Sequence, residues 1–163
     1  MALLEDIIFS FQTTPGKGLP LGNLTSQLFV NVYMNEFDQF VKHRLKAKHY
    51  IRYADDLVFL SPDQSQLVQY ITAIQSFLPD KLCLTLHPKK VHIQTLASGV
   101  DFLGWLHFPF HRDLRKTTKD RMIRRVQEHP VPETVQSYLG LLKHGNTHKV
   151  RQQVLNGYWL WQE

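Results

Sequence analysis

Two adjacent aspartates between two short apolar stretches constrain the fold of this chain most strongly. Residues 49–61 read HYIRYADDLVFLS, so that β-prone residues flank Asp55 and Asp56. This pattern predicts a β-hairpin with the aspartates at or near its turn. Neighbouring side chains on a regular strand point to opposite faces, whereas at a turn both carboxylates can serve one ligand. The alternative interpretation is an ordinary polar β-turn.

Two adjacent carboxylates also predict a ligand. They repel each other, and between apolar strands they need a cation or exposure to water. Mg²⁺ suits such a pair because it binds proteins through one or two carboxylates and completes its shell with substrate phosphates.

The remaining segments before residue 110 predict an α+β fold. Helical spacing and breaker residues predict helices over residues 2–11, 23–45 and 64–78, the last of them ended by Pro79. Alternating apolar residues at 82–86 and the apolar stretch 100–108 predict strands. The order favours an antiparallel sheet with packed helices over a regular β-α-β repeat.

The chain becomes helical and basic towards its end. Residues 116–128, 133–143 and 147–161 are predicted helices, separated by a proline-bracketed break and by the Gly145-Asn146 turn. We place a boundary near residues 109–115, which gives a mixed region over 1–110 and a small helical region over 111–163.

Composition narrows the function class. The 163 residues hold 19 Lys and Arg against 14 Asp and Glu. Residues 1–88 carry a net charge of −1 and residues 89–163 carry +6, which favours a nucleic-acid partner for the second half. No apolar run suits a membrane span or a secretory signal. The single cysteine, Cys83, excludes an internal disulfide and favours a reducing, cytoplasmic setting. Its apolar surroundings predict a buried thiol.

A glycine-rich loop opens the predicted helix over 23–45. It reads Gly18-Leu19-Pro20-Leu21-Gly22, followed by Asn23, Leu24, Thr25, Ser26 and Gln27. Glycine permits a ligand to approach the backbone closely, and a helix N-terminus offers free N–H groups to an anion. A nucleoside triphosphate or a template backbone suits this place, and a simple capped helix is the alternative.

Four motifs in order resemble those of reverse transcriptases. Tyr53-Ala54-Asp55-Asp56 is similar to the YxDD box, and Gly18–Gly22 resembles the GLPxG box. Residues 86–90 (LHPKK) are similar to the next box, with His87 in place of the usual asparagine, and Phe102-Leu103-Gly104-Trp105 resembles the FLG primer-grip hairpin. Together they span residues 16–108, and their common order makes the resemblance specific.

The resemblance implies a partial polymerase palm, carrying the YADD hairpin, followed by a helical thumb. It implies RNA-directed DNA polymerisation with an RNA template, a DNA primer, deoxynucleoside triphosphates and two Mg²⁺ ions, for which Mn²⁺ can substitute. Asp55 is then the main metal ligand, Asp56 a second ligand and Lys90 a candidate general acid. The nucleotide or template site comprises Gly18, Leu19, Pro20, Leu21, Gly22, Ser26, Gln27 and Tyr53. The primer grip comprises Phe102, Leu103, Gly104 and Trp105, and the thumb residues facing the duplex backbone are Arg112, Arg115, Lys116, Lys119, Arg121, Arg124 and Arg125.

One departure points to a branch of the bacterial retron and group II intron-like class. Leu21 stands where most members carry glutamine, and Gln27 stands where they carry proline. This variant resembles the diversity-generating retroelement branch, in which the replacement is associated with misincorporation opposite template adenine. A leucine cannot make the hydrogen bonds that a glutamine side chain offers.

The resemblance also implies missing parts. The family's upstream catalytic aspartate and its fingers have no counterpart in the 17 residues before Gly18, where Asp6 lies too close to the box. We therefore expect the chain alone not to polymerise. A truncated gene, a split enzyme completed by a second polypeptide and a remnant kept for nucleic-acid binding are the three explanations; a retroelement accessory protein is a further possible partner. A missing palm strand predicts an exposed sheet edge and apolar surface.

Overall fold

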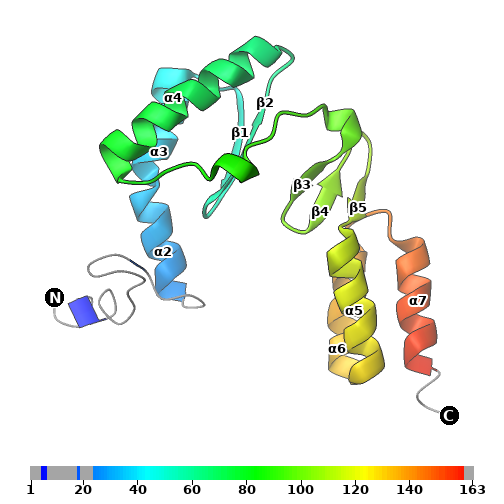
Figure 1. Cartoon of the computed structure of the whole chain (residues 1–163). Helices are drawn as coiled ribbons and strands as arrows, with labels where there is room; N and C mark the ends of the chain where they lie inside the picture. The colour runs from blue at the N-terminus through cyan, green and yellow to red at the C-terminus, as the bar shows by residue number, and fades with distance from the viewer. Residues whose placement is uncertain (1–4, 7–17, 19–23, 160–163) are drawn as a thin grey trace. The chain divides into compact units, whose positions relative to one another are not determined.

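The computed structural model describes residues 5–6, 18 and 24–159 and forms two compact units, Met1–Ile93 and Gln94–Glu163 (Figure 1). Each unit has a hydrophobic core of its own. The predicted α+β class is confirmed, since helices accompany two small antiparallel sheets. In the described part of the chain, no helix has the length and apolarity needed to cross a bilayer.

The first unit begins with three successive helical segments where the sequence predicts one helix. These are α2 (Leu24–Tyr33), α3 (Asn35–Gln39) and the π-helical η1 (Phe40–Leu45). Bonds from Met34 N to Val30 O at 2.9 Å and from Asp38 N to Met34 O at 3.0 Å carry the helical ladder across the junction. Of the helix predicted over residues 2–11, only Glu5 and Asp6 are described, and both are helical.

The predicted hairpin is confirmed. Strand β1 (His49–Tyr53) pairs antiparallel with β2 (Asp56–Leu60). The last pair is Tyr53 with Asp56, which leaves Ala54 and Asp55 as a two-residue turn. The inward residues of both strands pack on the core, as a half-buried antiparallel pair requires.

Helix α4 (Gln64–Leu82) begins where the sequence predicts, and Asp63 caps it by accepting a 2.8 Å bond from Ser65 N. The predicted end at Pro79 is wrong, because the helix continues to Leu82. Pro79 lies on the exposed face, where water can satisfy the carbonyl that loses its partner. Leu78 and Leu82, one turn apart, are both buried, and this burial favours the extra turn.

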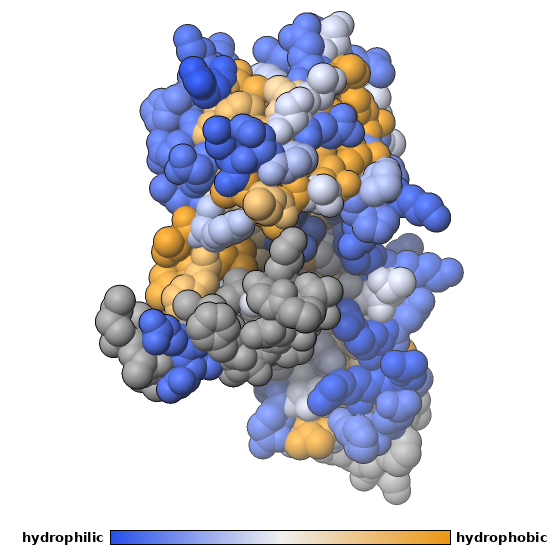
Figure 2. All heavy atoms as spheres, turned by 60° about the vertical axis from the view of Figure 1, so that its left-hand side comes forward, coloured by the Kyte–Doolittle hydropathy of each residue, from blue (hydrophilic) through white to orange (hydrophobic). Residues whose placement is uncertain are grey.

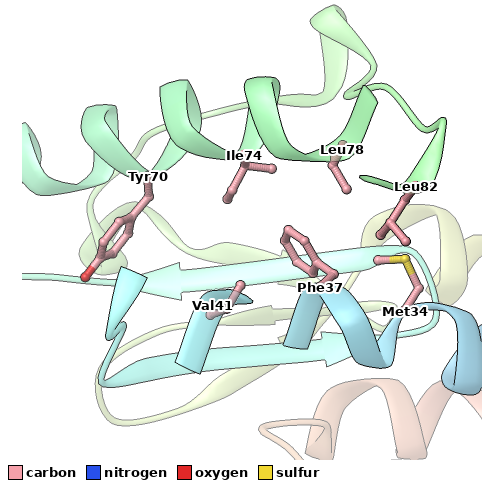
Figure 3. Packing of buried hydrophobic residues seen from close by; sticks show 7 residues of the cluster. All are labelled: Met34, Phe37, Val41, Tyr70, Ile74, Leu78 and Leu82. Atoms are coloured by element: carbon pink, nitrogen blue, oxygen red, sulfur yellow. The ribbon is translucent and has the colours of Figure 1, made fainter. Parts of the chain in front are cut away.

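Helix α4 covers the hairpin and faces the α3 region. Figure 3 shows Tyr70, Ile74, Leu78 and Leu82 pointing from α4 towards side chains of the earlier helices. Those side chains belong to Met34, Phe37 and Val41, and the latter two are fully buried. Phe40 and Phe77 stack at the margin of this cluster with ring centroids 4.0 Å apart.

The strand predicted from the alternation at residues 82–86 is wrong. Leu82 ends α4, and residues 84–87 form no strand. Cys83 ends the helix in the left-handed region (φ 48°), and its thiol is exposed, so the predicted burial of the thiol is wrong. A strand needs a hydrogen-bonding neighbour, and among the described residues none lies beside this segment. Two short 3-10 turns follow, η2 (Pro88–Lys90) and η3 (Leu96–Ser98).

The second unit opens with a three-stranded antiparallel sheet, β3 (Val100–Phe102), β4 (Trp105–His107) and β5 (Arg112–Leu114). Leu103 and Gly104 form the turn between β3 and β4, both with positive φ, which is the pattern of a type I′ hairpin. The hairpin predicted from Phe102–Trp105 is thereby confirmed.

Three helices complete this unit in the predicted places: α5 (Lys116–Glu128), α6 (Pro132–Leu142) and α7 (His148–Trp159). Met122, Val126, Val135, Leu142 and Val154 form the core between them. Trp105 and Leu114 join the same core, so the sheet packs with the helices. The division by compactness therefore falls after Ile93 and not near residues 109–115; the boundary at 110 stays a prediction about function.

Candidate active site

The turn of the first hairpin carries the two aspartates. Asp55 is the second residue of the turn and Asp56 the first residue of β2, and both are exposed. The turn position releases Asp55 from the strict alternation of a strand. The carboxylates are therefore neighbours at a solvent-accessible hairpin tip, as the sequence predicts, and Tyr53 beside them is 54 % exposed.

Arg52 attaches this turn to the helices behind it. Its guanidinium forms a forked pair with Asp38 of α3, with Nη2 to Oδ2 at 2.6 Å and Nε to Oδ1 at 2.9 Å. Nη1 donates to Asn31 Oδ1 of α2 and to the carbonyl of Ala54, each at 3.1 Å. A planar guanidinium with five donors suits this task. One side chain thus links two helices with the backbone of the aspartate turn.

The clamp formed by Arg52, Asp38 and Tyr50 shifts the pKa values of its members. The hydrogen bond from Arg52 is the main cause that lowers the pKa of Asp38 below its ordinary value. Burial, followed by the bond to Asp38, raises the pKa of Tyr50 far above its ordinary value. Tyr50 therefore stays protonated, and its hydroxyl donates a hydrogen bond to Asp38 Oδ1 at 2.8 Å. Asp38 accepts three donors and stays ionised, which keeps the turn anchored.

Ala54 has φ 51°, a left-handed value that is uncommon for a residue with a Cβ. Its carbonyl is the atom that Arg52 binds. Backbone of this kind persists where the surroundings hold it in place. The described contacts identify Arg52 as the residue that does so here.

Lys90 lies in the η2 turn of the first unit and is exposed. His87 precedes this turn, and its ring Nδ1 accepts a 3.3 Å bond from Lys89 N, while its carbonyl accepts a 2.9 Å bond from Lys90 N. An asparagine oxygen at position 87 would offer the same kind of acceptor. The turn therefore forms although the sequence departs from the family pattern at this residue.

The glycine-rich box is mostly outside the described residues. Gly18 is exposed with φ 142°, a conformation that favours glycine. Leu19, Pro20, Leu21 and Gly22 lie outside the described part. Further along α2, Ser26 is buried and Gln27 is exposed.

The residues of the predicted primer grip differ in their exposure to solvent. Leu103 is 48 % exposed at the turn, whereas Trp105 is 7 % exposed and belongs to the core. The carbonyl of Gly104 accepts a 3.0 Å bond from Arg115 N, which ties the turn to the start of α5. Within this box, Leu103 is thus the side chain open to solvent, and Gly104 is the residue whose backbone is held in place.

The basic residues predicted to face a duplex divide into two groups. Arg112 lies in β5, not in a helix, and donates a hydrogen bond to the carbonyl of His144. Arg115 precedes α5 and donates a hydrogen bond to the carboxylate of Asp101. The helix α5 carries the remaining five: Lys116, Lys119, Arg121, Arg124 and Arg125. Lys119 is half-buried and the other four are exposed. Of these seven predicted residues, the α5 group therefore presents cations that have no strong anchor within the described part of the chain; Arg124 has a 3.9 Å exposed pair with Glu128.

A comparison with protein families agrees with this geometry. The family model for reverse transcriptase (RNA-dependent DNA polymerase) matches residues 8–107, well over half of the chain. The chain belongs to the reverse transcriptase family. A search of curated proteins finds no match. The matched range includes both hairpins and ends with β4, before the three helices of the second unit.

The carboxylates of this reverse transcriptase domain fit a divalent metal only in part. Asp55 and Asp56 supply the hard oxygen donors that Mg²⁺ prefers. Among the residues that the structure describes, no three His, Cys, Asp or Glu side chains are arranged to hold a metal. The two carboxylates can therefore supply part of a Mg²⁺ coordination shell, and further oxygen donors are needed to complete it.

Sequence reasoning missed the Arg52 clamp. An arginine within the apolar run HYIRY, on the side of β1 that packs inwards, was the available signal. A buried position for arginine requires a carboxylate partner. Asp38, fourteen residues earlier, becomes recognisable as that partner only from the fold.

Proposed function

We propose that this chain supplies the carboxylate turn of an RNA-directed DNA polymerase and extends a DNA primer on an RNA template only with complementing parts. The observation that carries the proposal is the Asp55-Asp56 pair on the Arg52-anchored turn, within the range that matches the family. The fingers and a further catalytic carboxylate would come from a second polypeptide.

In this proposal Asp55 and Asp56 hold Mg²⁺, which when bound lowers the pKa of an attacking hydroxyl and neutralises phosphate charge. Asp55 is the main ligand because the turn presents it beyond the strand end. Arg52 keeps the turn in place through Ala54. Lys90, exposed on η2, would donate a proton to the pyrophosphate that leaves when the primer hydroxyl bonds to the α-phosphorus. Leu103 and Gly104 position the primer strand, and α5 binds the duplex backbone by charge.

Exposed apolar side chains of the first unit support a second polypeptide. Figure 2 shows apolar surface among its polar residues, and Leu28, Val32, Ile51 and Leu60 are each at least 40 % exposed. Among the described residues, β1 and β2 have no further strand beside them. Unpaired edges and exposed apolar groups favour association. A monomer in light scattering that binds no apolar dye would contradict this part of the proposal.

Primer extension tests the function. We expect no extension on an RNA template in Mg²⁺ by the chain alone. With an added polypeptide that carries reverse transcriptase fingers and the first palm strand, we expect extension that Asp55→Asn abolishes. Asp80→Asn is the matched control, because among the described residues this exposed aspartate has an ion pair with Lys81 alone. Extension that survives Asp55→Asn would overturn the proposal.

A second candidate is a nucleic-acid-binding module without catalysis, which the cationic face of α5 favours. Duplex binding that survives Asp55→Asn, together with no extension in the complemented mixture, would select it. In either case a cytoplasmic setting agrees with the single cysteine.

We also propose a finer branch. Leu21 and Gln27 resemble the variant of this box in the diversity-generating retroelement enzymes, and a leucine cannot make the side-chain hydrogen bonds that a glutamine could make near the incoming nucleotide. We expect Leu21→Gln in the complemented polymerase to lower misincorporation opposite template adenine, measured by sequencing the products. An unchanged error rate would remove the branch assignment and leave the family membership intact.

A further inference from the structure

An open hollow of about 550 Å³ lies in the second unit, formed by residues to which the proposed catalysis gives no role; one of them, Arg112, is among the residues expected to face a duplex. The loop between β4 and β5 forms one wall and the turn before α7 forms the other. Its lining comprises His107, Phe108, Pro109, Phe110, His111, Arg112, His144, Gly145 and Asn146.

The backbone holds both walls in place. Asn146 N donates to Arg112 O at 2.9 Å, and Phe108 N donates to His111 O at 2.9 Å. Arg112 Nε also donates to the carbonyl of His144, and its guanidinium lies over the ring of Trp105 at 5.2 Å. An added Cβ at Gly145 would lie 2.8 Å from Arg112 O and nearer still to the Trp105 ring, so the close approach requires glycine. The hollow is thus pre-formed.

The charge of the lining favours an anion. Its formal charge comes from Arg112, its three histidines offer ring N–H donors, and within the described chain none of the lining residues is acidic. Asp113, the carboxylate that pairs with His111 at 3.8 Å, is itself half-exposed. Among the described residues, no three His, Cys, Asp or Glu side chains are arranged to hold a metal.

The hollow also presents aromatic rings beside its arginine. Phe110 is 98 % exposed, which leaves a complete ring in water at the loop tip. Beside it Phe108 stacks on His111 with centroids 4.6 Å apart and planes at 10°. Exposed rings beside cations are the arrangement with which proteins stack the bases of single strands and hold their phosphates.

We propose that this hollow binds one nucleotide of single-stranded nucleic acid. The ring of Phe110 stacks on the base, and the further N–H donors of Arg112 contact the phosphate with the imidazole of His144. His107 lies at the margin of this contact, since its Nε2 is 3.3 Å from the carbonyl oxygen of Phe102. An unpaired base is required, because bases within a duplex keep their faces covered. The proposal rests on the proposed function in one respect, which is that the bound nucleotide belongs to a template or product strand.

Fluorescence anisotropy of the full chain with short labelled strands tests this, without metal. RNA, DNA and an abasic strand of equal length and charge are compared. We expect the wild-type chain to bind a base-bearing strand about tenfold more tightly than the abasic strand. Phe110→Ala should abolish that difference, whereas Phe110→Trp should keep it and show fluorescence quenching by the base. Trp159→Ala, which removes another exposed aromatic ring, should leave it intact.

Each outcome of this binding assay has a distinct meaning. Tighter RNA binding identifies a template strand, tighter DNA binding identifies a product strand, and equal binding supports the site for both. An unchanged base preference in Phe110→Ala overturns the proposal. Loss of self-association in that variant, with no effect on either strand, also overturns it and assigns the ring to a protein interface. Because the assay needs no catalysis, its failure is distinct from failure of primer extension.

Discussion

Ala54 shows how a single residue stores strain beside the proposed metal ligands. Its left-handed φ of 51° places the following carboxylate, Asp55, at the hairpin tip. A left-handed residue with a Cβ costs about 1–2 kcal/mol, and this cost is offset by contacts such as the Arg52 bond to its carbonyl. The strained residue thus precedes the proposed main ligand directly.

We predict that Ala54→Gly raises the free energy of unfolding of the first unit by about 0.5–1 kcal/mol, because relief of strain exceeds the added chain entropy. Ala73→Gly, inside α4, should lower it by about 1 kcal/mol. Urea unfolding followed by circular dichroism measures both. Destabilisation by Ala54→Gly would show that the turn is not strained.

At the scale of elements, the clamp of Arg52, Asp38 and Tyr50 joins the β1–β2 hairpin to α3. The side chains of Arg52 and Asp38 are only 10 % and 21 % exposed. Their pair is therefore less screened than the exposed pair of Asp80 with Lys81. A hairpin of two five-residue strands is marginal by itself, so such attachment to helices is needed.

We predict an acid-dependent loss of stability in the first unit. The folded pKa of Asp38 is below its ordinary value of 3.8, so its contribution is complete above pH 3.8 and is lost as the pH falls further, through the folded pKa. Asp38→Asn should lower the free energy of unfolding at neutral pH by about 2–3 kcal/mol. It should also reduce the further loss of stability below pH 3.8. Asp80→Asn should change little.

The two units can be followed separately in this experiment. Every tryptophan of the chain lies in residues 94–163, so tryptophan fluorescence reports the second unit. We expect Asp38→Asn to shift the circular dichroism transition and leave the fluorescence transition unchanged. An equal shift of both signals would mean that the units unfold together.

At the scale of the whole molecule, charge divides between the units. The acidic tip of the first hairpin lies in one, and the helix α5, with five basic and two acidic side chains, lies in the other. Burial of Met122 and Val126 sets which way α5 faces and leaves four of its cations exposed. A duplex that reaches α5 would release counterions from its phosphates.

We predict that replacing Arg121 and Arg125 by glutamine weakens RNA–DNA duplex binding. The slope of log affinity against log salt should fall by about 0.9 for each phosphate that the variant no longer binds. Arg44→Gln in the first unit is the matched control. Anisotropy titrations over a range of salt concentrations measure the slopes. Equal slopes for the wild-type chain and both variants would exclude α5 from the duplex interface.

Local pattern determined much of this protein by itself. The hairpin around Asp55, the turn at Leu103 and the three last helices follow from short-range signals: alternation, turn residues, and prolines beside periodic apolar positions. Family membership follows likewise from motifs in order. The roles of Asp55, Asp56 and Lys90 remain predictions, although the structure describes all three.

Tertiary structure alone decided the rest, because burial depends on residues distant in sequence. Pro79 lies within α4 since Leu82 joins the core that includes Met34, and Cys83 follows that helix in a left-handed conformation with an exposed thiol. Arg52 finds Asp38, and Arg112 is held by Trp105 and His144 instead of extending from a helix. Each of these contacts joins segments that no local pattern relates, and burial of apolar side chains or pairing of buried polar groups favoured them over local propensity.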